Sequence, residues 1–179
     1  MQHRHFLAAR EGVEHGAQEC GPQRQIGRAE RDQSADDAPV GGFEIVEEIP
    51  AYRGVRYGMN LVRDRLPDGR IAEREIVRNN GAAVIVPLLD DGRVILVEEH
   101  RTTLGHDLFE IPAGVLEAGE DPAEAAVREL EEETGYRAAH LEKLFTFHPT
   151  PGFCDEAMHI FLGTGLTATR QDLDDDEFI

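Results

Sequence analysis

The sequence predicts an α+β fold in which short strands lie before and after one well-marked helix. Short runs rich in β-branched residues recur from Phe43 onward, separated by the glycine, proline and aspartate residues that are typical of turns. The stretch from Asp121 to Gly135 instead has the start and stop signals of a helix. The chain's 179 residues fit one ordinary domain with room for a sizeable core.

Residues 1–41 differ in composition from the rest of the chain. They are rich in Gln, Arg, Gly and Asp and lack a sustained apolar period, so they cannot bury much surface. His3, His5 and His15 fit no metal-binding spacing well, and a solvated tail explains them better. We expect a disordered, non-native-looking N-terminal tail.

Strands are predicted on both sides of the helix. Residues 42–80 predict a small antiparallel sheet, with runs at 43–50, 55–66 and 71–79 and a turn at Pro67–Gly69. The apolar runs at 82–89 and 93–101 suit central strands, and the Asp90–Gly92 segment between them predicts a hairpin. Further strands are expected at 108–112, 141–149 and 156–163, with a loop at 149–156.

The helix has signals at both ends. Asp121 can cap its N-terminus, Pro122 suits the first helical position, and Glu124 completes a capping box. Gly135 suits the C-terminal stop. At 100° per residue, the arc that we expect to face a sheet holds Ala123, Ala126, Val127 and Leu130.

Four glutamates crowd the end of this helix. Glu129, Glu132 and Glu133 share one face, whereas Glu131 points elsewhere and is better interpreted as a solvated charge. Each like-charge pair at i, i+4 destabilises an isolated helix by roughly 0.2 to 0.5 kcal/mol, and acid near the C-terminus opposes the helix dipole. A bound Mg²⁺ would offset this repulsion. For this turn taken alone, a surface helix that tolerates acid is the favoured interpretation.

The composition argues against some classes of partner. The net charge of -18 would repel the phosphate backbone of nucleic acid, so we expect no nucleic-acid partner. No apolar run approaches the length of a membrane span, so we expect no membrane association and a cytoplasmic location. Cys20 and Cys154 are the only cysteines, and we expect both to be reduced.

The residues around the acidic turn reverse the balance between a surface helix and a metal site. From Gly114 to Tyr136 the chain reads GVLEAGEDPAEAAVRELEEETGY, which resembles the Nudix box, Gly-x5-Glu-x7-Arg-Glu-aliphatic-x-Glu-Glu-x-Gly-aliphatic. Tyr136 departs from the pattern, which has an aliphatic residue there. Seven fixed identities at these spacings would arise by chance on the order of 10⁻⁷ per starting position.

This resemblance implies an activity and a set of roles. Nudix proteins hydrolyse nucleoside diphosphates linked to another moiety, with Mg²⁺ or Mn²⁺ held against the pyrophosphate. By similarity, the metal ligands would be Glu129, Glu133, the carbonyl of Ala113 and Glu132, the last also an electrostatic partner. Arg128 would pair with Glu120 and hold the box in shape, and an i, i+4 contact with Glu124 is compatible with that role.

The segments flanking the box resemble the ADP-ribose pyrophosphatase branch of the family. The run REIVRNNGAAVIVPLLDDGRVILVEEHR, the later FEIPAG and Pro151, fifteen residues after the box, carry this resemblance. It implies a Nudix fold at 81–179, with a mixed β-sheet sandwiched between helices (α/β/α). The sheet at 42–80 precedes this domain and would form a homodimer.

The family normally continues past the final DDDEFI into another strand and a helix. We therefore expect a domain truncated at its C-terminus. Together with the unusual tail, this suggests a fragment, a shifted reading frame or a misassigned start.

In this branch the loop after the box supplies a catalytic carboxylate. Glu156 is the expected general base and Asp155 the reserve, although both could be plain loop charges. Arg101 and, more weakly, Arg78 are expected to bind phosphate or ribose oxygens, because a guanidinium can contact two oxygens at once. Tyr52 could stack on adenine, also across a dimer interface, or be an ordinary half-buried tyrosine.

The leading functional hypothesis is metal-dependent hydrolysis of ADP-ribose to AMP and ribose 5-phosphate. A close alternative is cleavage of another nucleotide sugar, such as ADP-glucose or GDP-mannose. The alternative from a different class is a Nudix-fold module that binds ADP-ribose without cleaving it. The full set of box residues argues against that module, because a site that only binds has no need for all of them.

Overall fold

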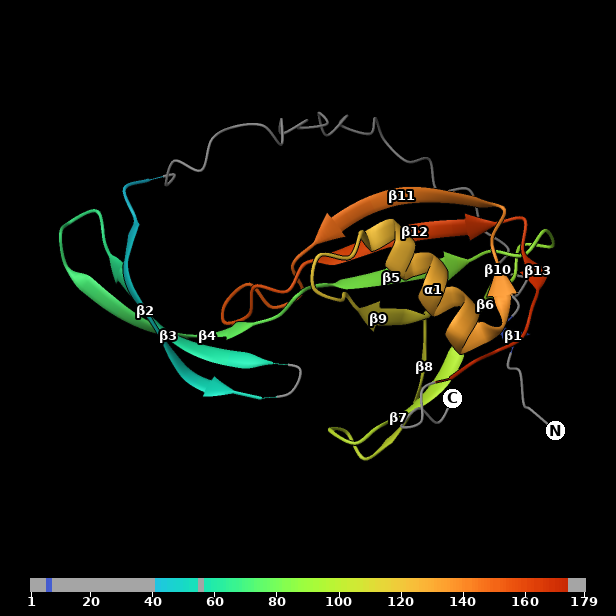
Figure 1. Cartoon of the computed structure of the whole chain (residues 1–179), viewed down its shortest axis with the longest axis horizontal. Helices are drawn as coiled ribbons and strands as arrows, with labels where there is room; N and C mark the ends of the chain where they lie inside the picture. The colour runs from blue at the N-terminus through green and yellow to red at the C-terminus, as the bar shows by residue number, and fades with distance from the viewer. Residues whose placement is uncertain (1–5, 8–40, 55–56, 174–179) are drawn as a thin grey trace, which may run out of the picture.

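The computed structural model describes residues 6–7, 41–54 and 57–173, and the two larger sheets that these residues form lie apart along the long axis (Figure 1). A three-stranded sheet lies at one end, and a four-stranded sheet with helix α1 forms the larger body. The predicted tail at 1–41 and the predicted truncation beyond 173 fall almost wholly outside the described residues.

The N-terminal sheet has the antiparallel order β2-β3-β4, as the sequence predicts. Its strands are β2 (Glu44–Arg53), β3 (Gly58–Arg65) and β4 (Ile71–Arg78). The predicted turn joins β3 to β4, and Gly69 adopts a φ of 84° there, a conformation that glycine adopts without steric cost. Ion pairs between neighbouring strands, such as that of Arg63 with Glu47 at 2.8 Å, lie on the exposed surface of the sheet.

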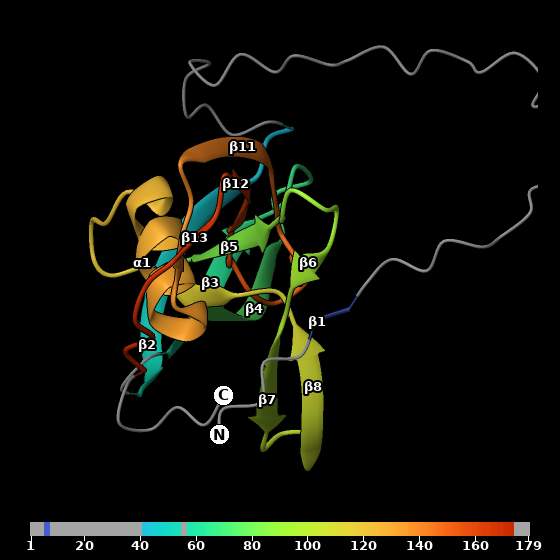
Figure 2. The same cartoon turned by 90° about the vertical axis from the view of Figure 1, so that its right-hand side faces the viewer.

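The second sheet has the order β11-β12-β5-β9. Its strands are β5 (Ala82–Pro87), β9 (Ala113–Val115), β11 (His140–Phe147) and β12 (Met158–Thr164). Strand β12 runs parallel to β5, and the other pairings are antiparallel, so the sheet is mixed as predicted. Helix α1 (Pro122–Thr134) lies across one face of this sheet (Figures 1 and 2).

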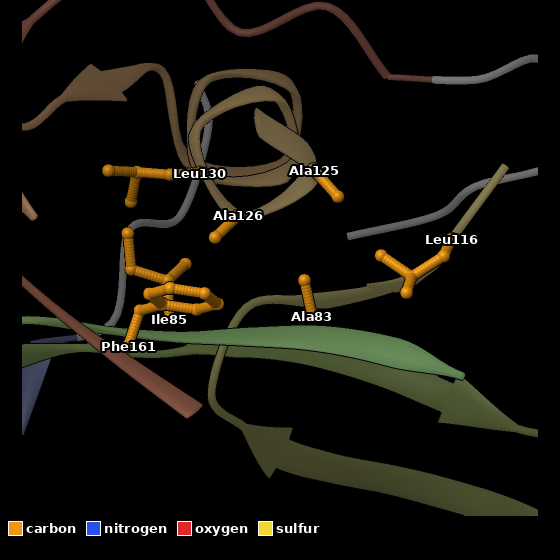
Figure 3. Close-up of a cluster of buried hydrophobic side chains, with 7 residues drawn as sticks. All are labelled: Ala83, Ile85, Leu116, Ala125, Ala126, Leu130 and Phe161. Carbon is orange, nitrogen blue, oxygen red and sulfur yellow. The ribbon is translucent and has the colours of Figure 1, made fainter. Parts of the chain in front are cut away.

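The core lies between α1 and this sheet (Figure 3). Leu130 and Ile85 are fully buried, and Phe161 of β12 packs beside them. The cluster is completed by Ala83, Leu116, Ala125 and Ala126. The small alanines let the helix approach the sheet closely, so the backbone of β9 comes near the last helical turns.

The helix arc predicted to face the sheet is partly wrong. Ala126 and Leu130 are buried and Ala123 packs against the core, but Val127 is 36% exposed. The buried arc instead includes Ala125 and both Glu129 and Glu133. The arc was predicted from apolar residues alone, and the two glutamates move its centre away from Val127.

The expected hairpin of two central strands is also wrong in part. Strand β5 is interior, but its neighbours are β12 and β9. It is linked to the next run only at the turn, by the antiparallel bridge between Leu88 and Val94 and a 2.9 Å hydrogen bond from the N–H of Leu89 to the carbonyl of Arg93. That run divides into β6 (Val94–Ile95), which pairs with β1 (Phe6–Leu7), and β7 (Val97–Arg101), which pairs with β8 (His106–Glu110). Because β9 pairs with Ala82–Val84 on this edge, the second run meets the edge only beyond the end of β5, at Leu88.

The expected α/β/α sandwich is not seen in the described part of the chain. There α1 is the single helix, so the fold is mostly β with a helix on one face of the mixed sheet. The remaining short strands are β10 (Tyr136–Arg137) and β13 (Thr167–Ala168), which pair with each other. Within the described ranges, no helix has the length and apolar character needed to cross a membrane.

Candidate active site

Helix α1 is fixed at both ends by the residues that the sequence singled out. Asp121 is the N-cap, and its Oδ1 accepts a hydrogen bond of 2.7 Å from the backbone N–H of Ala123. Gly135 ends the helix with a φ of 65°. A Cβ there would also lie 2.9 Å from the backbone nitrogen of Gln171, so only glycine fits. These caps fix the register of the acidic last turns.

Two of the clustered glutamates point inward. Glu129 is 7% exposed and Glu133 is 5% exposed, both on the helix face that packs toward β9. A Cβ added at Gly114 in β9 would overlap the Glu129 carboxylate. The first glycine of the box therefore leaves the space that this carboxylate occupies, a role that its position in the motif alone does not reveal.

Arg128 neutralises much of this acidity. Its Nε and Nη2 donate to the two oxygens of Glu120 at 3.0 and 3.2 Å, so the expected pair is present. Its Nη1 lies 2.8 Å from Glu129 Oε1 and 2.9 Å from Glu132 Oε2. Hydrogen bonding to Glu120 raises the pKa of Arg128, and the same contact lowers the pKa of Glu120. One guanidinium thus holds three carboxylates in place.

The chain beyond the helix supports the same turn. Gln171 Nε2 donates to the carbonyl of Glu133 at 2.6 Å, and the backbone N–H of Asp172 donates to the carbonyl of Glu132 at 3.1 Å. These contacts satisfy carbonyls at the helix end that have no partner within the helix. The sequence gives no signal for them, because neither residue belongs to a capping motif.

The loop at 149–156 separates its two neighbouring carboxylates. Asp155 Oδ2 accepts from Arg78 Nη1 at 3.0 Å, and its Oδ1 accepts from the backbone N–H of Asn79 at 2.9 Å. Glu156 instead receives a 3.1 Å hydrogen bond from Asn79 Nδ2. Only Glu156 of this pair lines the main cleft, which favours it over Asp155 as the candidate base.

This cleft has a volume of about 520 Å³ and lies beside β9 and the last turns of α1. Charged residues from four segments line it: Glu99, Arg101, Glu117, Arg128, Glu129, Glu133 and Glu156. Its uncharged lining includes Tyr57, Asn80 and Ala113. Residues far apart in sequence therefore converge on one concave surface, which is the usual form of a small-molecule site.

Arg101 reaches the cleft as expected, but it is engaged by acid. Its Nε and Nη2 donate to Glu110 at 2.7 Å each, and its Nη1 lies 2.8 Å from Glu99. Hydrogen bonding to Glu110 raises the pKa of Arg101 and lowers that of Glu110. The bidentate pair fixes the plane of the guanidinium at the cleft wall.

The structure does not bring all predicted site residues together. Arg78 and Tyr52 are not among the cleft residues: Arg78 pairs with Glu48 and Asp155, and Tyr52 is 62% exposed. Tyr57, which the sequence did not single out, is the aromatic residue of the cleft. Glu132 lines a separate hollow of about 260 Å³ with Glu131, Arg128, Arg170 and Asp172.

Glu131 is not a purely solvated charge. Its carboxylate accepts from Arg137 Nη2 at 2.7 Å, and it lies on the helix side away from the main cleft. The prediction that it points away from the other three glutamates is confirmed for Glu129 and Glu133, which line the cleft, but not for Glu132, which shares a hollow with Glu131. The ion pair with Arg137 joins the helix to β10.

The inward carboxylates have the chemistry that a hard divalent cation needs. Glu133 Oε2 accepts from the backbone N–H of Ala113 at 3.2 Å, and Glu129 fills the space left by Gly114, so both carboxylates lie against β9. Oxygen donors of this kind suit Mg²⁺ or Mn²⁺. Within the described ranges, no three acidic, His or Cys side chains already form a metal-binding group, because Glu129 and Glu132 are turned toward Arg128.

Comparison with known proteins identifies the family. A model of the NUDIX domain matches residues 78–179, more than half of the chain. The chain belongs to the Nudix family. The matched range contains α1, β9 and every described residue that lines the cleft except Tyr57.

Curated relatives of this Nudix chain have more than one name. It is 46% identical over 116 residues to an ADP-ribose pyrophosphatase of Bacillus subtilis, covering 64% of this chain and 63% of that protein. It is 38% identical over 125 residues to an ADP-ribose pyrophosphatase of Mycobacterium tuberculosis, covering 69% of this chain and 60% of that protein. The chain therefore spans less than two thirds of these two relatives.

Two further matches cover a larger share of both this chain and the matched protein. The chain is 44% identical over 135 residues to a methanol dehydrogenase activator of Bacillus methanolicus, covering 74% of this chain and 72% of that protein. A solved structure described as an ADP compounds hydrolase has a TM-score of 0.67 at 26% identity, covering 75% of this chain and 74% of that one. The fold and family are thus shared among proteins with different named activities.

Proposed function

We propose that this Nudix protein is a metal-dependent pyrophosphohydrolase that cleaves ADP-ribose to AMP and ribose 5-phosphate. The observation that carries the proposal is the cleft, where Glu129 and Glu133 of α1 meet Arg101 and Glu156 from other segments. Hydrolysis at phosphorus requires three kinds of group: carboxylates to hold a cation, a guanidinium to bind phosphate, and a separate carboxylate to accept a proton.

Glu129 and Glu133 would hold Mg²⁺ or Mn²⁺, with the carbonyl of Ala113 and Glu132 as further candidate ligands. The ion would neutralise the pyrophosphate oxygens and lower the pKa of a bound water. Glu132 can join only if it leaves Arg128, because its Oε2 lies 2.9 Å from that guanidinium. Arg128 and Glu120 touch no reacting atom in this scheme and keep Glu129 in position.

Glu156 would take the proton from the attacking water. The water oxygen forms a new bond to one phosphorus of the pyrophosphate, the bond from that phosphorus to the bridging oxygen breaks, and the second phosphate leaves. Arg101 would bind a phosphate oxygen, because Glu110 already holds its guanidinium in one orientation at the cleft wall. Arg78 and Tyr52 would reach substrate only if bound nucleotide extends past the cleft, with Tyr52 also available across a dimer.

ADP-ribose is the favoured substrate because two relatives named ADP-ribose pyrophosphatase are 46% and 38% identical to this chain over 116 and 125 residues. Other nucleotide sugars, such as ADP-glucose or GDP-mannose, contain the same pyrophosphate and are the close alternatives. A non-catalytic regulatory module is the alternative from a different class. The relative named methanol dehydrogenase activator is the observation that keeps this alternative under test.

We also propose that the protein is a homodimer formed through the sheet at residues 42–80. Every residue of β2 is exposed, including several large apolar side chains: Ile45, Val46, Ile49 and Tyr52. Phe43 beside β2 and Ile71 of β4 are also exposed, and we call these six exposed apolar residues the β2 surface. Apolar clusters of this kind mark protein interfaces.

A product assay tests the activity. The protein is incubated with ADP-ribose, ADP-glucose, GDP-mannose and a dinucleoside polyphosphate, each with Mg²⁺, with Mn²⁺ or with a chelator, and the products are identified by mass. We expect AMP and ribose 5-phosphate from ADP-ribose, with metal only. Faster cleavage of another sugar nucleotide would reassign the substrate, and tight binding of ADP-ribose without cleavage would favour the regulatory module.

A further inference from the structure

Asn79 lies where the N-terminal sheet meets the loop that carries the candidate base. The end of β4 pairs with this loop: the N–H of Val77 donates to the carbonyl of Phe153 at 2.7 Å, and the N–H of Asp155 donates to the carbonyl of Val77 at 3.3 Å. A parallel bridge between Val77 and Cys154 records the same register. This backbone pairing brings residue 79 beside residues 155 and 156.

The orientation of the Asn79 side chain is fixed by chemistry. Its Oδ1 accepts a 2.7 Å hydrogen bond from the backbone N–H of Gly81. Because an N–H group can only donate, the oxygen of the amide must face Gly81, and the NH₂ group must face the other way. That NH₂ group lies 3.1 Å from Glu156 Oε1.

The backbone of Asn79 completes the arrangement. Its N–H donates to Asp155 Oδ1, so Asp155 is held between Asn79 and Arg78 while the Glu156 side chain is held by the Asn79 amide. His148 Nδ1 contacts the carbonyl of Glu156 at 2.8 Å and anchors its main chain. One residue therefore directs the first carboxylate toward Arg78 and the second along the cleft wall.

We propose that Asn79 is a positioning residue that sets the orientation of the Glu156 carboxylate for proton transfer. This inference rests on the proposed function of Glu156 as the general base. A carboxylate with one oxygen bound to a fixed amide samples fewer rotamers than a carboxylate on a mobile loop. The Glu156 side chain then loses less conformational entropy when the water and the substrate bind in the reactive orientation.

The test is a double-mutant cycle with N79A, E156Q and N79A/E156Q, in which kcat and KM are measured with ADP-ribose and Mg²⁺. We expect N79A to lower kcat about tenfold with KM changed less than about twofold, because the lost contact orients a reacting group and does not bind substrate. In the E156Q background the same change should lower kcat by less than about twofold. A residue needed only for folding would not show this non-additivity.

Two further variants complete the experiment. N79D keeps an acceptor for the N–H of Gly81 but turns a carboxylate oxygen toward Glu156, so we expect at least as large a loss of kcat. It remains informative if N79A lowers stability. N60A is the matched control, since Asn60 Nδ2 also donates to a carboxylate, Glu48 Oε1 at 2.6 Å, but outside the cleft. We expect its kcat to be unchanged.

The outcomes separate this inference from the proposed function. If E156Q is impaired but the Asn79 effect is equally large in both backgrounds, Asn79 does not act through Glu156 and this inference is overturned alone. An effect of N79A confined to KM would overturn it in the same way. Full turnover by E156Q would instead remove the base assignment and this inference together.

Discussion

The two sheets of this molecule differ in how they are stabilised. All ten residues of β2 are exposed, whereas five of the six residues in β5 are buried under α1 and between neighbouring strands. The larger body therefore has its own core, whereas the N-terminal sheet, in which Val62 is buried, relies mainly on hydrogen bonds and exposed ion pairs. Exposed ion pairs contribute little, with a median of about 0 to 1 kcal/mol each.

The two sheets also differ in what they contribute to the candidate active site. The buried acid of Glu129 and Glu133 sits on the well-packed helix, where rigid neighbours can hold a reactive geometry. The N-terminal sheet contributes at its junction, where Arg78 and Asn79 contact the 149–156 loop. The weakly packed sheet thus approaches the cleft through Tyr57, just before β3, and through the contacts at the end of β4.

The largest expected effect is on the core. Leu130 is fully buried between α1 and the mixed sheet, so L130A should lower the free energy of unfolding by about 2 to 5 kcal/mol. Ile45 of the β2 surface is 60% exposed, so I45A should change it by less than about 0.5 kcal/mol in the isolated subunit. Denaturant unfolding followed by circular dichroism measures both. Equal losses would contradict the contrast between the two sheets.

The next effect concerns the acid of the last helical turns. E133Q should lower kcat at least about 100-fold, because it removes charge from a proposed metal ligand, while weakening the fold little since it also relieves repulsion. The control is E131Q, a change on the same helix that removes only the ion pair with Arg137. Steady-state kinetics and thermal melts distinguish them. Full activity in E133Q would refute the ligand assignment.

A smaller effect is expected at the β2 surface. I45K places charge within the proposed dimer contact and should weaken dimerisation at least about tenfold. L104K is the control, since Leu104 is equally prominent, at 58% exposed, but lies in the turn between β7 and β8. Sedimentation equilibrium over a concentration series reports the dissociation constant. A wild-type protein that stays monomeric at high concentration would exclude this interface.

The smallest effect is a dependence on pH. The hydrogen bond from Arg128, with a further one from the N–H of Glu117, lowers the pKa of Glu120 below its ordinary 4.5. The folded protein then binds fewer protons than the unfolded chain, so this stabilisation is complete above pH 4.5 and is lost as pH falls through the lower folded-state value.

A comparison of the wild type with E120Q isolates this contribution. The variant should be less stable at about pH 6 by roughly 1 kcal/mol, and the difference should shrink below the ordinary pKa of Glu120. Glu48 of the N-terminal sheet, whose pKa is lowered chiefly by Asn60, provides E48Q as the corresponding change there. We expect a smaller difference for E48Q because Glu48 is more exposed than Glu120. If the stability difference between the wild type and E120Q stayed constant across pH, the pKa shift of Glu120 would not be its cause.

Local features of this molecule were readable from its sequence. The helix ends at Asp121 and Gly135 follow from the chemistry of caps, and the pair of Arg128 with Glu120 follows from the box. The N-terminal sheet follows from its β-branched runs and the turn at Gly69. In each case the information lies within a few residues of the feature, or within a motif of fixed spacing.

Contacts between segments far apart in the chain could not be predicted from the sequence. Apolar runs predicted the strands at 82–89 and 93–101, but the choice of partner for β5 depends on β12, which lies far along the chain. The Asn79 to Glu156 contact joins residues 77 apart, and nothing near either residue indicates the other. Tyr57 rather than Tyr52 lines the cleft, and no pattern near either tyrosine indicates which ring reaches it.

Arg128 affects how a cation could enter the acidic site. Its guanidinium serves as an internal counterion for Glu120, Glu129 and Glu132. The carboxylates of these three glutamates therefore have a positive partner within the protein itself. Under the proposed function, a cation that binds Glu129 would compete with the tethered guanidinium of Arg128.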